Sequence, residues 1–319
     1  MEKDFMRAVI VESLPERRLV LRDVPESSRG EGEVLVRVRA ISLNRGEVNE
    51  ALTGASPGPR PGVDFSGVVE EAPEGSGFQA GDRVAGLRPA GAWAERIAVP
   101  PFLLARVPDG VGFEQAAALP VAGLTAMLAL AKGAPLANRR VLVTGATGGV
   151  GLLAVQLAAR AGAHVTALAR AEAHRSILER AGAHAVAIGS ARAEAGAPYH
   201  LILESVGGAL LGEALGWLAS RGGCVLVGNS GGATTTFDAD RFRMGGGGVY
   251  GGTTLYGFYL GEELERAPPG QPLMDLLQKV AEKSLDPMIS VTASWSRIHD
   301  VATALLERRF LGKAVLLLD

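Results

Sequence analysis

The segment "VLVTGATGGVG", residues 141–151, constrains the fold of this 319-residue chain more than any other. Branched apolar residues run into four glycines within seven positions, which is typical of a buried strand, a tight turn and a helix. Glycines in such a turn allow positive φ, let backbone N–H groups approach an anion, and bring the helix close to the sheet. The spacing matches neither G-x-G-x-x-G nor the G-K-[ST] of a P-loop. The turn therefore predicts an anion site, or a tight connection that binds nothing.

Strands and helices alternate around this turn. The expected strands read "HVTALAR", "HAVAIGS", "YHLILESVG" and "GCVLVGNS", and the expected helices read "GVGLLAVQLAARAGA", "AEAHRSILERAGA" and "GALLGEALGWLAS". A further helical stretch, "FEQAAALPVAGLTAMLALAKG", precedes them at 113–133. Short, nearly all-apolar strands that alternate with helices indicate a parallel sheet covered on both faces.

Residues 1–118 show a different pattern. Short β-type runs such as "EVLVRVRAISL", "FSGVVEEA" and "AERIAVP" are separated by clusters of Pro, Gly and Asp. The chain ends on "GKAVLLLD", and we expect this strand to rejoin the sheet of residues 1–118. With 319 residues and 47% hydrophobic content, two domains are expected.

Composition excludes several classes of partner. The net charge is −2, with no lysine or arginine run, so neither nucleic acid nor an anionic membrane is indicated as a partner. No stretch approaches a membrane span, and the N-terminus lacks the apolar core of a secretory signal. The single cysteine, Cys224, excludes an intrachain disulfide and any zinc site built from several cysteines. A soluble, cytoplasmic protein is expected.

The residues after the second strand of the alternation bear on the cofactor. That strand ends at Arg170, 19 residues after Gly151, where a dinucleotide site contacts the adenosine ribose. An acidic residue there would favour NAD, whereas Arg170 and Arg175 favour the 2′-phosphate of NADP(H). The alternative is that these arginines only begin a solvated helix. Glu204, Asn229 and Ser230 follow later strands, where they either line the ligand crevice or cap turns.

At this point the chain resembles the medium-chain dehydrogenase/reductase superfamily, in its zinc-independent quinone oxidoreductase (zeta-crystallin-like) branch. The residues that carry the resemblance are "SLNRGEV", "PGVDFSGVV", "GDRVAGL", "AALPVAGLTA", "VLVTGATGGVG", "GNSGG" and "GKAVLLLD", in the family's order. The resemblance implies an α/β protein with a Rossmann doubly wound parallel sheet and a GroES-like β-rich catalytic domain. The catalytic domain would comprise residues 1–118 completed by 286–319, and the NADP-binding domain residues 119–285. The resemblance also places the active site in the cleft between these two domains.

The resemblance also implies that no metal is bound. The zinc-dependent branch carries Gly-His-Glu where this chain reads Gly62-Val63-Asp64, so the histidine ligand is replaced by valine. The five histidines show no paired ligand spacing, and Cys224 lies in an apolar strand where a buried structural thiol is the ordinary interpretation.

Site residues follow from the turn, the strand ends and the resemblance together. The candidates for catalysis are Asn44, Arg45, Glu47 and Asp64. Those for the cofactor are Thr125, Thr147, Gly148, Gly149, Val150, Arg170, Arg175, Glu204, Asn229, Ser230, Gly252, Thr253, Thr254 and Lys313. Asn44 corresponds to an asparagine near the nicotinamide in the resembled family, or else forms an Asx turn. Arg45 and Glu47 either act on the substrate or pair with each other.

The expected activity is zinc-independent, NADPH-dependent reduction of a quinone or an α,β-unsaturated carbonyl. A conjugated acceptor spreads the charge that hydride addition creates, so hydrogen-bond donors suffice without a Lewis acid. An enoyl-thioester reductase of the same superfamily is an alternative, although "NRGEVNEALTGASPG" lacks the tyrosine those enzymes usually carry. A second alternative is a non-catalytic NADPH-binding sensor. In the resembled family the strand at "GVYGGTTLYG" often pairs with its twofold mate, which implies a homodimer.

Overall fold

The computed structural model describes residues 5–13, 16–26, 29–54, 60–245 and 251–318. The chain falls into two compact units, Met1–Leu124 with Leu264–Asp319, and Thr125–Glu263. The predicted domain boundaries lie at 118/119 and 285/286, whereas the units divide at 124/125 and 263/264, within helices α3 (Pro120–Ala131) and α9 (Leu260–Arg266). The two units are described separately.

The central unit contains a six-stranded sheet in which every neighbouring pair is parallel. Its strands are β8 (Arg140–Val143), β9 (His164–Ala169), β10 (Ala185–Ile188), β11 (Tyr199–Glu204), β12 (Leu218–Leu226) and β13 (Thr254–Gly257). They lie in the order β10-β9-β8-β11-β12-β13. Numbered from β8, this is 3-2-1-4-5-6, the doubly wound order with its switch point between β8 and β11.

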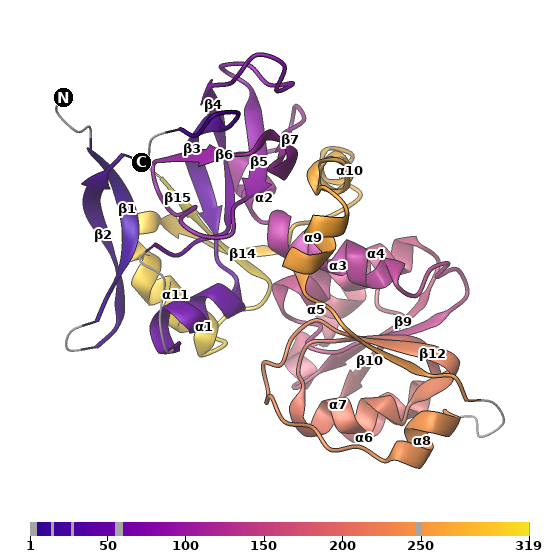
Figure 1. Ribbon diagram of the computed structural model, residues 1–319. Coiled ribbons are helices and arrows are strands. Elements are labelled where there is room, and N and C mark those ends of the chain that lie inside the picture. Colours follow the sequence, from indigo (N-terminus) through magenta and orange to yellow (C-terminus); the bar gives the residue numbers. More distant parts are fainter. Residues whose placement is uncertain (1–4, 14–15, 27–28, 55–59, 246–250, 319) are drawn as a thin grey trace. The chain divides into compact units, whose positions relative to one another are not determined.

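Helices cover both faces of this sheet. They are α4 (Gly149–Arg160), α5 (Arg175–Arg180), α6 (Ser190–Ala193), α7 (Gly208–Leu215) and α8 (Ala239–Met244), with short 3-10 turns at Glu172–His174 and Glu194–Gly196. Helices α4 and α7 lie on opposite faces (Figure 1). Because both faces are covered, the middle of the sheet is apolar, as at Val141, Leu142 and Val143 of β8, all 0% exposed.

The other unit is β-rich. A seven-stranded sheet has the order β14-β15-β3-β4-β5-β7, with β6 also paired to β3, and a separate hairpin joins β1 and β2. These strands are β1 (Phe5–Glu12), β2 (Arg18–Pro25), β3 (Val34–Ser42), β4 (Asp64–Glu71), β5 (Arg83–Leu87), β6 (Arg96–Val99), β7 (Leu104–Arg106), β14 (Ile289–Ser294) and β15 (Lys313–Leu317). Its helices are α1 (Arg45–Thr53), α2 (Phe113–Ala117), α10 (Gly270–Ala281) and α11 (Ile298–Leu306), with 3-10 turns at Pro101–Leu103 and Trp295–Arg297.

The C-terminal strand confirms one expectation. Strand β15 pairs antiparallel with β3, with Val315 opposite Ser42, so the end of the chain completes the sheet that the first hundred residues begin. The mixed α/β fold with a parallel Rossmann sheet and a separate GroES-like unit is therefore the fold that the sequence predicted.

Two expected elements were drawn too long. The stretch 113–133 forms two helices, because α2 ends before Pro120 and α3 begins at that proline, whose ring cannot continue a preceding helix. The expected helix "GALLGEALGWLAS" stops at Leu215, since Gly216 interrupts it and Leu218 already belongs to strand β12. No helix among the described residues is both long and apolar enough to cross a membrane.

Candidate functional site

The first candidate site is the start of helix α4, directly after β8. Gly148 is the N-cap residue, with φ −81° and ψ 173°, and neither a side-chain cap nor an acidic residue occupies the first turn. The first N–H groups of this 12-residue helix therefore have no side-chain acceptor. Unpaired N–H groups together with the positive end of the helix dipole make this position suited to a phosphate or pyrophosphate.

Two glycines make this turn possible. Gly145 has a φ of +53°, and Gly151 lies so close to it that a Cβ on Gly151 would be 2.4 Å from the Gly145 carbonyl oxygen. The helix can thus begin directly above the turn. Thr147, Gly149 and Val150 surround the same helix start and are only partly buried, so this part of the predicted cofactor set is accessible.

The side chain of Glu204, at the end of β11, stabilises the turn that follows it. Its carboxylate accepts hydrogen bonds from Thr144 Oγ1 (3.0 Å), Val206 N (2.9 Å) and Gly207 N (2.9 Å). Burial raises the pKa of this carboxyl, partly offset by these hydrogen bonds. These hydrogen bonds hold the turn at the edge of the sheet, and the contact of Glu204 with the cofactor stays a prediction.

The two arginines predicted to select NADP(H) differ in their surroundings. Arg170 follows β9, is exposed, and no hydrogen bond or ion pair joins it to another described residue. Arg175 is paired with Glu172 and lies 3.9 Å from Glu179, and its Nη1 donates to the Val186 carbonyl at 3.2 Å. Arg170 is therefore the arginine available to an incoming phosphate.

The remaining predicted cofactor residues of this unit lie at several places. Asn229 and Ser230 follow β12 on the surface, and the Ser230 hydroxyl donates to the Ser205 carbonyl at 3.0 Å. Thr253 donates to the Phe242 carbonyl, Gly252 has a φ of +85°, and Thr254 begins β13. Thr125 is 6% exposed on α3. The start of "GVYGGTTLYG", residues 248–250, lies outside the described residues.

The second candidate site is a buried charged cluster in the β-rich unit, formed by Asn44, Glu47, Asp64 and Lys313. Asn44 Nδ2 donates to Glu47 Oε1 (3.0 Å) and to Asp64 Oδ2 (2.8 Å), and Lys313 Nζ donates to Asn44 Oδ1 (2.6 Å). Lys313 Nζ is also 3.6 Å from Asp64 Oδ2. Asp64 is 0% and Lys313 3% exposed, whereas Asn44 and Glu47 are partly buried.

Sheet order brings these residues together. Strands β15, β3 and β4 are neighbours, so the start of β15 and the start of β4 lie on either side of the end of β3. Helix α1 begins just beyond β3 with Asn44 as its N-cap, whose backbone N–H donates to Glu47 Oε1 at 2.8 Å. Three of the four predicted catalytic residues thus lie in one cluster with Lys313, a residue predicted to bind the cofactor.

Burial and charge act against each other in the cluster. Burial raises the pKa of Asp64 and lowers that of Lys313, while each group favours the charged form of the other. Burial, followed by the charge of Asp64, raises the pKa of Glu47 to about 8. An ion pair of Lys313 with one carboxylate balances the charge, and the second carboxyl is then best kept neutral.

Arg45 and Asn44 have other partners than expected. Arg45 Nη1 donates to the Leu305 carbonyl of α11 at 2.9 Å, and this hydrogen bond fastens α1 to that helix. Both amide protons of Asn44 are used within the cluster, which leaves none for a substrate carbonyl.

Sequence reasoning missed residues that support these sites. Val121 N donates to Asp64 Oδ1 at 2.9 Å, and Ser42 Oγ lies 3.4 Å from Asp64 Oδ2. Thr144 bonds to Glu204 and accepts from Ser205 N at 3.0 Å. Thr144 ends the strand run "VLVT" and Ser42 stands two residues before Asn44, so polar residues at strand ends were the available signal. Nothing in the spacing indicated Val121.

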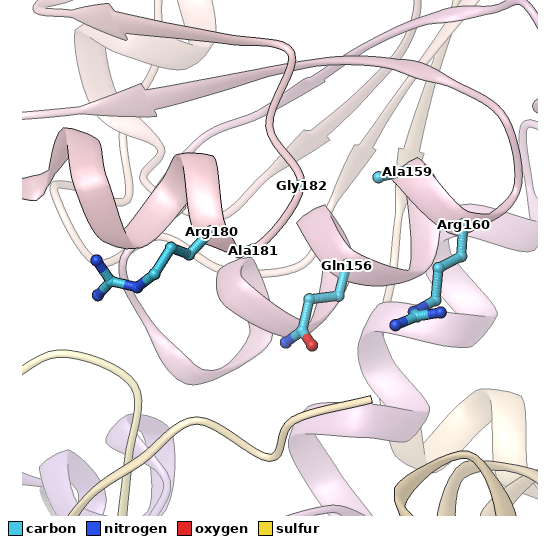
Figure 2. Close-up of a pocket in the computed structure, with 6 residues that line it drawn as sticks. All are labelled: Gln156, Ala159, Arg160, Arg180, Ala181 and Gly182. Carbon is cyan, nitrogen blue, oxygen red and sulfur yellow. The ribbon is translucent and has the colours of Figure 1, made fainter. Parts of the chain in front are cut away.

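A pocket of about 300 Å³ lies elsewhere in the central unit, between the ends of α4 and α5 (Figure 2). Gln156, Arg160 and Arg180 project from these helices toward the same side. The 12 residues of α4 separate this end from the Gly148 turn by roughly 18 Å. Arginine in a last helical turn is favoured by the helix dipole, and the pocket holds none of the predicted site residues.

Two family models match the chain. The GroES-like domain of alcohol dehydrogenases matches residues 30–109, and the zinc-binding dehydrogenase family matches residues 149–277. Solved structures with TM-scores of 0.79–0.85 and 22–28% identity cover 97–100% of the chain. The chain belongs to the medium-chain dehydrogenase/reductase superfamily. Quinone oxidoreductases of Coxiella burnetii and of a mycobacterium are among the solved structures to which it is similar.

Three of these solved structures illustrate the likeness. A mycobacterial quinone oxidoreductase is 26% identical, with a TM-score of 0.83 over 98% of this chain and 99% of its own. The YhdH oxidoreductase of Salmonella enterica, solved in complex with NADP, is 24% identical, with a TM-score of 0.79 over 98% and 100%. CurK enoyl reductase is 22% identical, with a TM-score of 0.81 over 98% and 99%. The last two likenesses concern the fold.

The curated relatives are much longer proteins. Erythronolide synthase EryA2 of Saccharopolyspora erythraea is 45% identical over 149 residues, which is 46% of this chain and 4% of that synthase. The chain spans between 4% and 9% of the length of such polyketide synthases.

Proposed function

We propose that the chain is an NADPH-dependent oxidoreductase that reduces quinones or α,β-unsaturated carbonyls by hydride transfer, without zinc. The observation that carries the proposal is the start of α4, which follows β8 in a doubly wound sheet and has no side-chain cap. Arg170, which pairs with no described residue, follows the next strand, β9. Family membership supports a nicotinamide cofactor, and the NADP complex of YhdH supports the phosphorylated form.

The residues at the carboxyl edge of the sheet fit the cofactor. The N–H groups of Gly149 and Val150 would bind the pyrophosphate, because no side chain caps them. Arg170 would bind the 2′-phosphate through charge-assisted hydrogen bonds. Bound NADPH would supply the hydride. The turn at Glu204, held by Thr144, Val206 and Gly207, keeps this edge in place without contributing a charge to the nucleotide.

The side chains available support zinc-free chemistry. Val63 stands where the zinc-dependent branch has histidine, and in the described part of the chain no three His, Cys, Asp or Glu side chains are grouped so as to hold a metal ion. Burial raises the pKa of the Cys224 thiol well above its usual range, which keeps it from being a thiolate ligand. Turnover should then be unchanged by chelators, and stoichiometric zinc in the purified protein would contradict the proposal.

The test is NADPH consumption with 1,4-benzoquinone, an enone and a trans-2-enoyl thioester. Turnover of the quinone or the enone supports the proposal. Turnover of the thioester alone would favour an enoyl-thioester reductase, which the likeness to CurK enoyl reductase and to polyketide synthases makes the second candidate. Tight NADPH binding without turnover of any of them would favour a sensor instead.

We also propose a homodimer formed through strand β13. This strand is at the edge of the six-stranded sheet, and large hydrophobic side chains near it are exposed, Leu255 at 39% and Tyr259 at 75%. An unpaired edge strand is suited to pairing with a second copy. Light scattering of the purified protein would decide this, and a monomer at micromolar concentration would contradict it.

A further inference from the structure

The same five residues, Arg-Ala-Gly-Ala-His, occur at two connections of the central unit. The first copy, residues 160–164, runs from the last residue of α4 to the first of β9, and the second, residues 180–184, from the last residue of α5 to the residue before β10. The glycine of each copy has a positive φ, +79° at Gly162 and +101° at Gly182. A glycine in this conformation ends a helix, so the turn explains the central Ala-Gly-Ala but requires neither the arginine nor the histidine.

The two copies are in contact with each other. Strands β9 and β10 are parallel neighbours, so both connections reach the same edge of the sheet. The rings of His164 and His184 meet edge to face, with their centroids 5.3 Å apart. A Cβ on Gly182 would lie 3.0 Å from the Cβ of Ala159, so the turn after α5 packs against the end of α4. The repeated sequence therefore builds one continuous surface.

The pocket of about 300 Å³ between the ends of α4 and α5 is lined by the arginine of each copy. Figure 2 shows Arg160 and Arg180 on the same side of the two helices, and Gln156 projects from α4 toward that side as well. The other lining residues are small: Ala159, Ala181 and Gly182. A cavity of this volume is at the lower end of the range for small-molecule sites.

Neither arginine is needed to cap its helix. The three carbonyls before each arginine already accept backbone N–H groups of the turn, those of residues 157–159 from residues 161–163, and those of residues 177–179 from residues 181–183. No hydrogen bond or ion pair joins the guanidinium group of Arg160 or Arg180 to another described residue. Both groups are exposed, and their N–H donors are therefore available to a ligand.

The charge around the pocket is positive. The connections that lead into β8, β9 and β10 contain no Asp or Glu: residues 132–139, 160–163 and 180–184. Glu179, the neighbour of Arg180 in the chain, lies 3.9 Å from Arg175 Nη1. Each helix end carries only about half a unit of negative charge, which the full charges of Arg160 and Arg180 outweigh. An anion is therefore the ligand that the pocket favours.

We propose that the two Arg-Ala-Gly-Ala-His turns together form a binding site for a phosphate group, either inorganic phosphate or the phosphate of a small ester. Arg160 and Arg180 would each donate charge-assisted hydrogen bonds to phosphate oxygens, a contact that suits the planar guanidinium group. Gln156 would contact the organic part of an ester. The inference goes beyond the proposed function, because it uses no residue assigned to NADPH or to the buried charged cluster.

This site is separate from the one proposed for the pyrophosphate of NADPH. The Gly148 turn lies at the carboxyl edge of the sheet, and the 12 residues of α4 place the pocket roughly 18 Å away, at the amino edge. Arg170, proposed for the 2′-phosphate, follows the carboxyl end of β9. Phosphate and NADPH should therefore bind at the same time.

The test is titration calorimetry of the full chain with glycerol 3-phosphate and with inorganic phosphate, at low ionic strength, with and without NADPH. One site is expected, with an affinity that NADPH does not change. Tighter binding of glycerol 3-phosphate would identify an ester as the ligand, and equal binding would identify free phosphate. No binding of either would overturn the inference, and succinate bound as tightly would overturn the choice of phosphate.

Three variants locate the site. Arg160→Gln and Arg180→Gln should each weaken phosphate binding about tenfold, the lower end for hydrogen bonds to a charged group, because both side chains are exposed. Arg39→Gln is the matched control, because it removes the same charge from an exposed arginine of β3 in the other unit, and it should bind phosphate like wild type. Urea unfolding should give similar stabilities for all three.

Three results would place the phosphate elsewhere and overturn the inference. Binding that persists in the double variant of Arg160 and Arg180 would exclude these side chains as ligands. Displacement of phosphate by NADPH would mean that it occupies the cofactor turn. An equal loss in R39Q would attribute the binding to overall charge. None of these results would contradict the proposed function, which depends on the turnover measurements alone.

Discussion

At the scale of single residues, two arginines that look equivalent in the sequence are not equivalent in the fold. Arg175 begins α5 and is held by Glu172 and by the Val186 carbonyl, whereas no described residue pairs with Arg170. An arginine already paired with carboxylates must lose those contacts to bind a phosphate. Selectivity for NADPH is therefore expected to depend on Arg170 far more than on Arg175.

Replacing Arg170 by alanine should weaken NADPH binding by about 1.5–3 kcal/mol, the range for a hydrogen bond to a charged group. Binding of NADH, which lacks the 2′-phosphate, should not change. Fluorescence titration of both nucleotides measures the two affinities, and Arg175→Ala is the matched control with a smaller effect. An equal loss for NADH and NADPH in R170A would contradict the assignment.

At the scale of elements, the contact between the glycine turn and α4 leaves no room for a side chain at Gly151. A Cβ on Gly151 would lie 2.4 Å from the Gly145 carbonyl oxygen and 2.7 Å from the Ala146 Cα, and all of these are backbone atoms that cannot rotate away. The helix would have to move off the turn, which would also displace the N–H groups of Gly149 and Val150.

Gly151→Ala should therefore destabilise the protein by about 1–3 kcal/mol, as overpacking does, and weaken NADPH binding as well. Gly46→Ala is the matched control, because Gly46 also lies in the first turn of a helix but a Cβ there meets nothing within 4 Å. That variant should gain about 0.4–1 kcal/mol. Urea unfolding measures both, and a G151A protein as stable as wild type would show that α4 does not need this close approach.

Strands, helices and the pairing of the C-terminal strand were predictable from the sequence, but side-chain contacts between distant elements were not. The parallel sheet, the glycine turn and the return of "GKAVLLLD" to the first sheet follow from periodicity and strand ends. In the buried cluster, Asn44 contacts Asp64, 20 positions away, and Lys313, 269 positions away. These residues come together only because β15, β3 and β4 are neighbours in one sheet. Which carboxyl is ionised depends on hydrogen bonds such as the one from Val121, which residue type does not reveal.

At the scale of the whole molecule, the buried acid links stability to pH. The pKa of Glu47 is raised from 4.5 to about 8 in the folded chain, so between these values the folded state holds a proton that the unfolded state has released. Stability must then fall as pH rises through this interval, by at most about 1.4 kcal/mol per pH unit from this group. Burial raises the pKa of Glu204 too, which acts in the same direction, so wild type alone would not isolate Glu47.

The comparison with Glu47→Gln (E47Q) separates the two groups, because glutamine does not titrate and Glu204 is present in both proteins. Below pH 5 the two should have similar free energies of unfolding, and above it E47Q should become progressively more stable than wild type until the difference levels off beyond pH 8. Urea unfolding at pH intervals from 5 to 9 gives this difference directly. A difference that does not change with pH would mean that Glu47 loses its proton equally easily in the folded and unfolded chain. The Oε2 atom of Glu47, which is buried and has no hydrogen-bond partner among the described residues, argues against that outcome.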